Sequence, residues 1–161
     1  AIIEDRKAQD TCGGKGTKNQ WNDRISNTFL GDTWFVTPGT GTTGVGGTCA
    51  SFTLQAGTYE AHGMTYVCDG GSTFSQLVDA DDNVLAHHTS TQNDANINNA
   101  SNWIVPFAGA FTLTSDTLCN IRTYYTADNS VVSTCDAVYG YANFISGEHE
   151  CYSRVVIRKL K

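Results

Sequence analysis

The sequence predicts an all-β sandwich built from short strands in a single domain that covers residues 1–161. Glycine is frequent, with 16 residues, and Gly, Thr, Ser and Asn together are typical of many tight turns. No window places apolar residues at helical spacing over three turns with caps at both ends. Several short runs are instead rich in β-branched and aromatic side chains and are bounded by turn residues.

The expected strands follow one another with turn signals between them. In chain order they cover residues 2–8, 20–30, 52–54, 58–67, 72–78, 84–89, 103–113, 118–126, 137–145 and 152–160. The segment 79–83 is polar and turn-forming, which predicts a hairpin around it. Gly109 interrupts a long strand and is interpreted as a β-bulge. Residues 38–47 form a glycine-rich loop, and no internal repeat is visible, so the pattern favours a sandwich or jelly roll over a propeller.

Charge argues against several classes of partner. The net charge is −6, and the basic residues cluster only at 158–161. A nucleic-acid partner requires a basic face that displaces counterions, so we expect none. No apolar run is long enough to cross a bilayer, so membrane insertion is not expected either. Because Ala1 leads directly into a strand-like Ile2-Ile3, we expect that a leader or upstream segment has been removed.

The six cysteines indicate an oxidising compartment. They are even in number, widely spaced and without any C-x-x-C pair, which argues against a zinc or thioredoxin-like site. We therefore expect three disulfides in an extracellular, secreted or virion-surface protein, with buried free thiols as the alternative. A bridge between Cys12 and Cys49 would tie down the irregular N-terminal region. Sequence alone leaves fifteen connectivities possible for six cysteines.

Two clusters contain residue types that bind metal ions, but neither has the spacing of a metal site. The oxygen-rich residues Asp79, Asp81, Asp82 and Asn83 could bind calcium, but the EF-hand spacing is missing and a self-bonded turn is favoured. His87 and His88 are adjacent, so on a strand they face opposite sides and cannot chelate one ion. His62 and His149 are distant in sequence. We expect no metal and no cofactor.

Catalytic motifs are also missing. The chain has no G-x-S-x-G elbow, no H-E-x-x-H and no phosphate-binding loop. Glu148-His149-Glu150 combines two carboxylates with a histidine, but before Cys151 it is interpreted as a solvated turn. Glycoside hydrolysis needs a placed carboxylate pair. We therefore expect a protein that is not an enzyme.

Aromatic residues are the stronger functional signal. Tyr124 and Tyr125 are adjacent on a predicted strand, so one ring must lie on each face of the sheet. The polar loops 93–102 and 127–133 abut aromatic segments, and neutral amides beside a rigid ring suit hydroxyl-rich ligands. Asn99-Ala100-Ser101 is also a glycosylation acceptor sequence if the source is eukaryotic. The predicted ligand-binding residues are Asn98, Asn99, Trp103, Tyr124, Tyr125 and Asn129.

Several segments together resemble a known family. They are the opening 1–8, Gly13-Gly14 followed by 21–24 and 27–28, the strand-turn-strand 52–59 and the closing 155–160. This pattern is similar to the receptor-binding tip domains of phage and viral tail fibres, which have a jelly roll like that of tumour necrosis factor and complement-type globular heads. The resemblance spans the whole chain, although residues 62–88 match poorly and the six cysteines are unusual for the phage versions.

The resemblance carries three expectations. It implies a jelly roll, a homotrimer with aromatic residues at its axis, and both chain ends at a stalk-facing base. It also implies that the strand ending at Cys68 runs antiparallel to the last strand, which begins at Cys151. These two cysteines should then be bridged, leaving Cys119 with Cys135.

The sequence thus predicts a homotrimeric head domain that binds a cell-surface receptor, either a carbohydrate or a protein. Two other functions stay open. One is a structural or interaction subunit of an extracellular assembly, and the other is a glycan hydrolase. Solution mass, glycan binding and polysaccharide turnover distinguish the three.

Overall fold

A computed structural model describes residues 1–7, 16–39, 51–68, 72–88, 91–92, 102–126 and 150–161. In this part of the chain every regular element is a β-strand, which confirms the predicted all-β class. The twelve strands are β1 (Ile2–Lys7), β2 (Trp21–Asp23), β3 (Thr28–Leu30), β4 (Val36–Pro38), β5 (Ser51–Leu54), β6 (Gly57–Cys68), β7 (Ser72–Asp79), β8 (Val84–His88), β9 (Thr91–Gln92), β10 (Asn102–Leu113), β11 (Thr117–Tyr125) and β12 (Glu150–Lys159).

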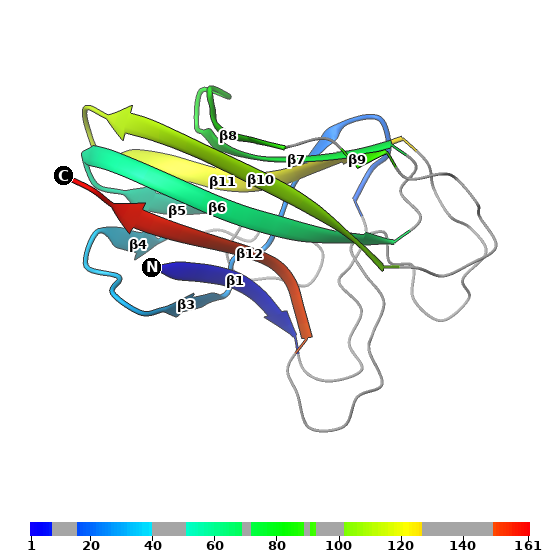
Figure 1. Cartoon of the computed structure of the whole chain (residues 1–161), viewed down its shortest axis with the longest axis horizontal. Coiled ribbons are helices and arrows are strands. Elements are labelled where there is room, and N and C mark those ends of the chain that lie inside the picture. The colour runs from blue at the N-terminus through cyan, green and yellow to red at the C-terminus, as the bar shows by residue number, and fades with distance from the viewer. Residues whose placement is uncertain (8–15, 40–50, 69–71, 89–90, 93–101, 127–149) are drawn as a thin grey trace.

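The strands form two facing layers, joined along one edge (Figure 1). Sheet A has the order β3-β1-β12-β6-β10, and sheet B has the order β8-β7-β11-β5-β4. Strand β8 pairs with β10 as well as with β7, and so connects the sheets. Strand β2 adds to β11 and β9 adds to β7. All pairings are antiparallel, and the sheet is nearly closed into a barrel-like sandwich.

Most predicted strands are present within a few residues of their expected bounds. The expected hairpin around 79–83 joins β7 and β8. The expected strand 20–30 is wrong as a single unit, because β2 and β3 are separate and join different sheets. The predicted strand 137–145 lies outside the described residues. Strands β4 and β9 were not predicted.

Gly109 is not a bulge. Strands β10 and β6 pair without interruption from Asn102 to Leu113, so the predicted bulge is wrong. A Cβ at Gly109 would come within 2.4 Å of the Leu85 carbonyl oxygen and 2.7 Å of the Ala86 Cα. Glycine is therefore required here for the close approach of β8, where the two sheets join.

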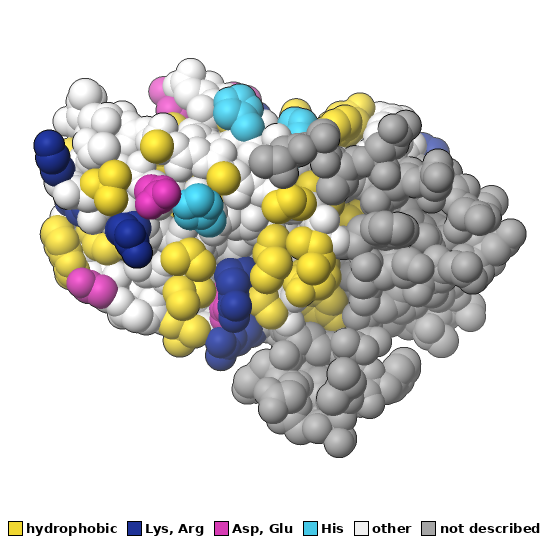
Figure 2. Space-filling model, in the orientation of Figure 1, with side chains coloured by type: hydrophobic (Ala, Val, Ile, Leu, Met, Phe, Trp, Pro, Cys, Tyr) yellow, Lys and Arg dark blue, Asp and Glu magenta, His cyan; other side chains and the backbone are white. Residues whose placement is uncertain are grey.

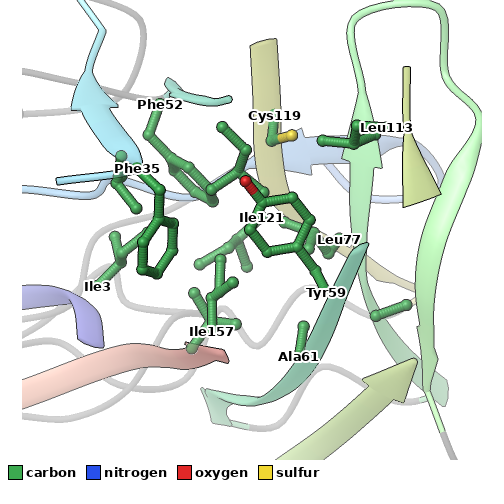
Figure 3. Packing of buried hydrophobic residues seen from close by; sticks show 14 of the residues in the cluster. Ile3, Phe35, Phe52, Tyr59, Ala61, Leu77, Leu113, Cys119, Ile121 and Ile157 are labelled. Carbon is green, nitrogen blue, oxygen red and sulfur yellow. The ribbon is translucent and has the colours of Figure 1, made fainter. Parts of the chain in front are cut away.

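The main core fills the sandwich at the end that carries both chain termini. Its buried side chains come from both sheets and include Phe35, Phe52, Tyr59, Ile121 and Ile157 (Figure 3). The rings of Phe35 and Tyr59 lie 5.8 Å apart. Alternation along β5 and β11 places Phe52, Leu54, Cys119 and Ile121 in this core, and the next two inward residues of β11 lie further along the interior.

A polar belt lies further along the same interior. It consists of the fully buried Thr65, Ser75, Thr123 and Ser153 together with Arg24. Thr65 Oγ1 lies 2.5 Å from Ser75 Oγ, and Thr123 Oγ1 lies 3.5 Å from each of these oxygens. Arg24 Nη2 donates to the carbonyl oxygen of Tyr152 at 2.8 Å. Beyond the belt, Val67, Val105 and Tyr125 form a second, smaller apolar cluster.

The two chain termini lie at one end of the sandwich, and the strands that flank the predicted ligand loops end or begin at the other (Figure 1). The termini lie close together at one end (Figure 1), where the Ala1 ammonium donates to the Ile157 carbonyl oxygen at 2.8 Å. The amide of Thr58 also donates to the Lys161 carbonyl oxygen at 3.0 Å. Strands β6 and β11 end, and β10 begins, at the opposite end. The predicted ligand loops 93–102 and 127–133 are therefore attached away from the termini.

Candidate functional site

The predicted ligand-binding residues fall into three groups. Asn98, Asn99 and Asn129 lie outside the described residues. Trp103 lies in β10 and pairs with Val67 of β6, but its side chain is not among the described parts. Only Tyr124 and Tyr125 are described in full.

The two tyrosines lie on opposite faces of β11, as predicted. Tyr125 is fully buried beside Val67 and Val105 in the smaller apolar cluster. Tyr124 is half-buried on the outer face of sheet B. Of the pair, Tyr125 supports the interior, and Tyr124 is the ring that a ligand could reach.

Tyr124 belongs to an aromatic row that crosses four strands. Its ring lies 5.6 Å from the ring of Trp21 on β2 and 6.2 Å from the ring of Phe74 on β7. The imidazole of His88 on β8 lies 4.8 Å from Phe74. Register explains the arrangement, because Tyr124 is directly opposite both Trp21 and Phe74, and opposite residues in a sheet point to the same face.

A tight turn before β2 positions Trp21. The Asn22 side chain accepts from the Thr17 amide at 2.7 Å and donates to the carbonyl oxygens of Thr17 and Gln20, each at 2.8 Å. Asn19 has a φ of 58°, a left-handed conformation that asparagine tolerates, and its amide donates to the Tyr125 carbonyl oxygen at 2.8 Å. These bonds hold the turn against β11 and leave Trp21 37% exposed.

Arg122 anchors the same surface. Its guanidinium lies 5.0 Å from the centre of the Trp21 ring, in a cation–π contact, and forms an ion pair with Asp82. With the Gln76 amide oriented so that its oxygen faces the guanidinium, that oxygen accepts from Nε at 2.7 Å and Nη2 at 2.8 Å. The charge of Arg122 is thus already matched within the protein.

The outer face of sheet A carries a second surface, which we call the apolar face. Ile104 and Val156 are 49% and 42% exposed there, and Figure 2 shows hydrophobic side chains gathering over the central strands of this sheet. Tyr66 is opposite Ile104, and Val156 is opposite Ile2. The members of this face are Ile2, Met64, Tyr66, Ile104, Pro106, Ala108, Ala110 and Val156.

Several polar and charged groups on this side of sheet A contact one another. His62 Nε2 lies 3.0 Å from Glu60 Oε1. Glu4 is fully buried and forms ion pairs with Arg6 and Arg154. Covering the apolar face with another protein surface would therefore leave the Glu4 carboxylate with both of its arginine partners.

The aspartates at 79–82 build a turn. The Asp79 carboxylate accepts from the amides of Asp81 (2.9 Å) and Asn83 (2.8 Å) and from the Asn83 side chain (2.8 Å). These hydrogen bonds hold the pKa of Asp79 below its ordinary value. This is the self-bonded turn favoured by the sequence. Across the described ranges, no group of three or more His, Cys, Asp or Glu is placed to hold a metal ion.

The two adjacent histidines lie in different surroundings. His87 is exposed, whereas His88 is half-buried against Phe74. Burial lowers the pKa of His88, and the neighbouring His87 lowers it further. The His88 ring is therefore neutral near pH 7, and the aromatic row carries no charge from it.

Two of the predicted disulfides are wrong. Cys119 and Cys151 are free thiols, so Cys119–Cys135 and Cys68–Cys151 are not present as disulfides. Cys119 points into the main core, and burial raises the pKa of its thiol to about 12. Cys12 and Cys49 lie outside the described residues, so the bridge between them stays a prediction.

The strand neighbours expected for the second bridge are nevertheless correct. Strand β6 does run antiparallel to β12. Their pairing begins only at Ser153, while Cys151 lies opposite Arg6 of β1. The two strands thus diverge before Cys151 reaches the end of β6 (Figure 1).

Comparisons with family models, with curated proteins and with solved structures find no match to this chain. The described ranges contain no helix of the length and apolarity that crossing a membrane demands. The assignment of a function therefore depends on the two surfaces above. Sequence reasoning singled out Tyr124 but missed Phe74 as its neighbour, because their pairing depends on which strands lie side by side.

Proposed function

We propose that the chain is a non-enzymatic head domain with a jelly-roll fold, related in architecture to tumour necrosis factor. It assembles as a homotrimer at a cell or virion surface and binds a cell-surface receptor. The strand order supports the jelly roll. When the eight strands β1, β5, β6, β7, β8, β10, β11 and β12 are numbered in sequence, sheet A reads 1-8-3-6 and sheet B reads 5-4-7-2. This is the winding of two Greek keys around one core.

The apolar face is the observation that carries the proposal of assembly. Soluble monomers seldom expose a large contiguous apolar patch, and closed cyclic symmetry hides such a patch from water. Ile104 and Pro106 on β10 and Val156 on β12 lie on the same face, on either side of β6, and the buried Glu4 carboxylate nearby is already paired. We propose a second and third copy of the chain as the partners that cover this face, each copy contributing a different part of its surface to the ring.

The positions of the chain ends support a head-like role. Both termini lie at one end of the sandwich, and the predicted ligand loops are attached at the other. A trimer with its termini at a base would present these loops to a cell surface. The extracellular location is part of the proposal and follows from the binding of a cell-surface receptor, since the free thiols of Cys119 and Cys151 give it no support.

Binding of the fluorescently labelled chain to intact cells, measured by flow cytometry, tests this function. The critical variant is Val156→Asp on the apolar face, and its matched control is Leu118→Asp on the outer face of sheet B. The two side chains are almost equally exposed, at 42% and 41%. We expect the wild type and Leu118→Asp to bind, and Val156→Asp to bind much more weakly because avidity is lost with the trimer. Absence of wild-type binding to every cell type tested would refute the proposal.

A further inference from the structure

We propose that the aromatic row on the outer face of sheet B is a binding site for neutral oligosaccharides. The inference deepens the proposed function, on which it rests, by naming the site and the class of receptor. The row consists of Trp21, Tyr124 and Phe74, with His88 at its end. It lies on the opposite side of the sandwich from the apolar face of sheet A.

The geometry suits a chain of sugar rings. The successive ring centres are 5.6 and 6.2 Å apart, so the row extends over more than one sugar residue. One side of a pyranose ring presents several C–H groups, whose partial positive charge is attracted to the negative face of an aromatic ring. Because Trp21 and Tyr124 are held by sheet register and by the turn at 17–20, little conformational entropy is lost when a ligand stacks on them.

Polar groups lie on the same face of the sheet as the rings. Asp23 lies two residues from Trp21 on β2 and so projects from the same face. The Asn120 side chain donates to the Asp23 carboxylate at 3.4 Å, which places an amide and a carboxylate side by side next to the rings. Ligand hydroxyls can donate to that carboxylate while the ring faces take the C–H groups.

The local charge selects neutral sugars over acidic ones. Arg122 is the cation in contact with the row, and its charge is matched by the ion pair with Asp82 and by the nearby Asp23. Within the described part of the chain, the cation in contact with the row is thus already matched, which disfavours a sulfate or a sialic-acid carboxylate as the ligand. The chain as a whole carries a net charge of −6, which further opposes binding of acidic glycans.

A glycan array probed with the full chain tests the inference. The array should carry neutral oligosaccharides together with sialylated and sulfated forms of the same cores. The critical variants are Trp21→Ala and Tyr124→Leu, the second of which keeps an apolar contact with Phe74 while removing the ring. We expect the wild type to bind neutral oligosaccharides, and each variant to bind them about tenfold more weakly, the loss typical of truncating an aromatic contact.

Trp34→Ala is the matched control. Trp34 is also an exposed tryptophan, at 63%, and it also lies beneath a cation, with Lys159 Nζ 4.8 Å from its ring centre. It stands apart from the aromatic row, so its removal should leave glycan binding unchanged. A thermal melt of each variant establishes that it is folded. If Trp21→Ala does not fold, Tyr124→Leu and Phe74→Leu decide the question.

Three outcomes would overturn the inference. They are unchanged binding by the folded row variants, a preference for the acidic glycans, and the failure of every neutral oligosaccharide to bind. Cells treated with periodate, which cleaves sugar diols, separate this inference from the proposed function. If the wild type binds treated and untreated cells equally, the glycan site is refuted and the receptor-binding head stands. If it binds neither cells nor glycans, both are refuted.

Discussion

The main core and the polar belt occupy the same gap between the same two sheets, yet they are stabilised differently. The main core is held by apolar burial, with Phe52, Tyr59 and Ile121 fully removed from water. The belt is held by hydrogen bonds among Thr65, Ser75 and Thr123. Apolar burial contributes to stability with each group that is removed from water, whereas buried hydroxyls contribute only while they remain paired. The comparison indicates that the termini end anchors the fold and that the belt mainly keeps strands in register.

Truncating the main core should give the largest effect. Phe52→Ala removes a ring that is fully buried between the sheets. We expect a loss of about 3–5 kcal/mol in the free energy of unfolding, because the lost transfer energy adds to the cost of a cavity. Urea denaturation followed by tryptophan fluorescence measures it. A loss smaller than that of a single belt substitution would remove the distinction between the two regions.

Breaking the belt one hydroxyl at a time should cost less. Ser75→Ala leaves Thr65 Oγ1 without its 2.5 Å partner, and we expect a loss of about 1–3 kcal/mol. Replacing the whole group with Thr65→Val, Ser75→Ala and Thr123→Val removes the donors and acceptors together. That triple variant should be closer to the wild type in stability than Ser75→Ala alone. If the losses simply add, the belt is not acting as a hydrogen-bonded unit.

A smaller, pH-dependent effect is expected from Asp5. Its side chain is 1% exposed, and burial raises its pKa despite the opposing influence of Arg24 and Lys7. A carboxyl group whose pKa is raised by folding contributes stability below its unfolded pKa of 3.8 and loses that contribution as the pH rises through the folded value. The stability of Asp5→Asn relative to the wild type should therefore increase between about pH 3 and about pH 7. Urea midpoints at the two pH values measure this, and a constant difference would contradict it.

Thiol labelling compares the main core with the start of β12 without changing either. Cys119 lies in the main core with a pKa of about 12, whereas Cys151 is half-buried at the start of β12, and burial also raises its pKa. We expect iodoacetamide to modify Cys151 first, and Cys119 only as fast as the protein unfolds. Peptide mapping by mass spectrometry reads both sites. A disulfide at Cys119 in the native protein would restore the bridge that the sequence predicted and contradict the structure.

Local patterns predicted the fold well where a strand is long enough to show alternation. Strands β6, β10 and β11 have at least nine residues each, and their bounds lie close to those expected. Strands β4 and β9 have three and two residues, too few for any period to be recognised. Sequence also identified the self-bonded turn at Asp79, because all its hydrogen bonds lie within five residues.

Features that depend on distant pairing were beyond the reach of local patterns. Gly109 was interpreted as a bulge because its neighbour β8 could not be known, and the close approach of that strand explains the glycine. Trp21 and Tyr124 are separated by about a hundred residues, and only the β2–β11 register brings their rings together. The separation of β12 from β6 before Cys151 likewise depends on how distant strands pair, which local sequence patterns do not specify.

The molar mass of the chain in solution tests the central claim, that the apolar face of sheet A assembles three copies. Multi-angle light scattering at micromolar concentration should give three times the chain mass for the wild type and for Leu118→Asp. Val156→Asp places a carboxylate in the proposed interface and should give the mass of a single chain. A monomeric wild type, or a Val156→Asp variant that remains trimeric, would contradict the account.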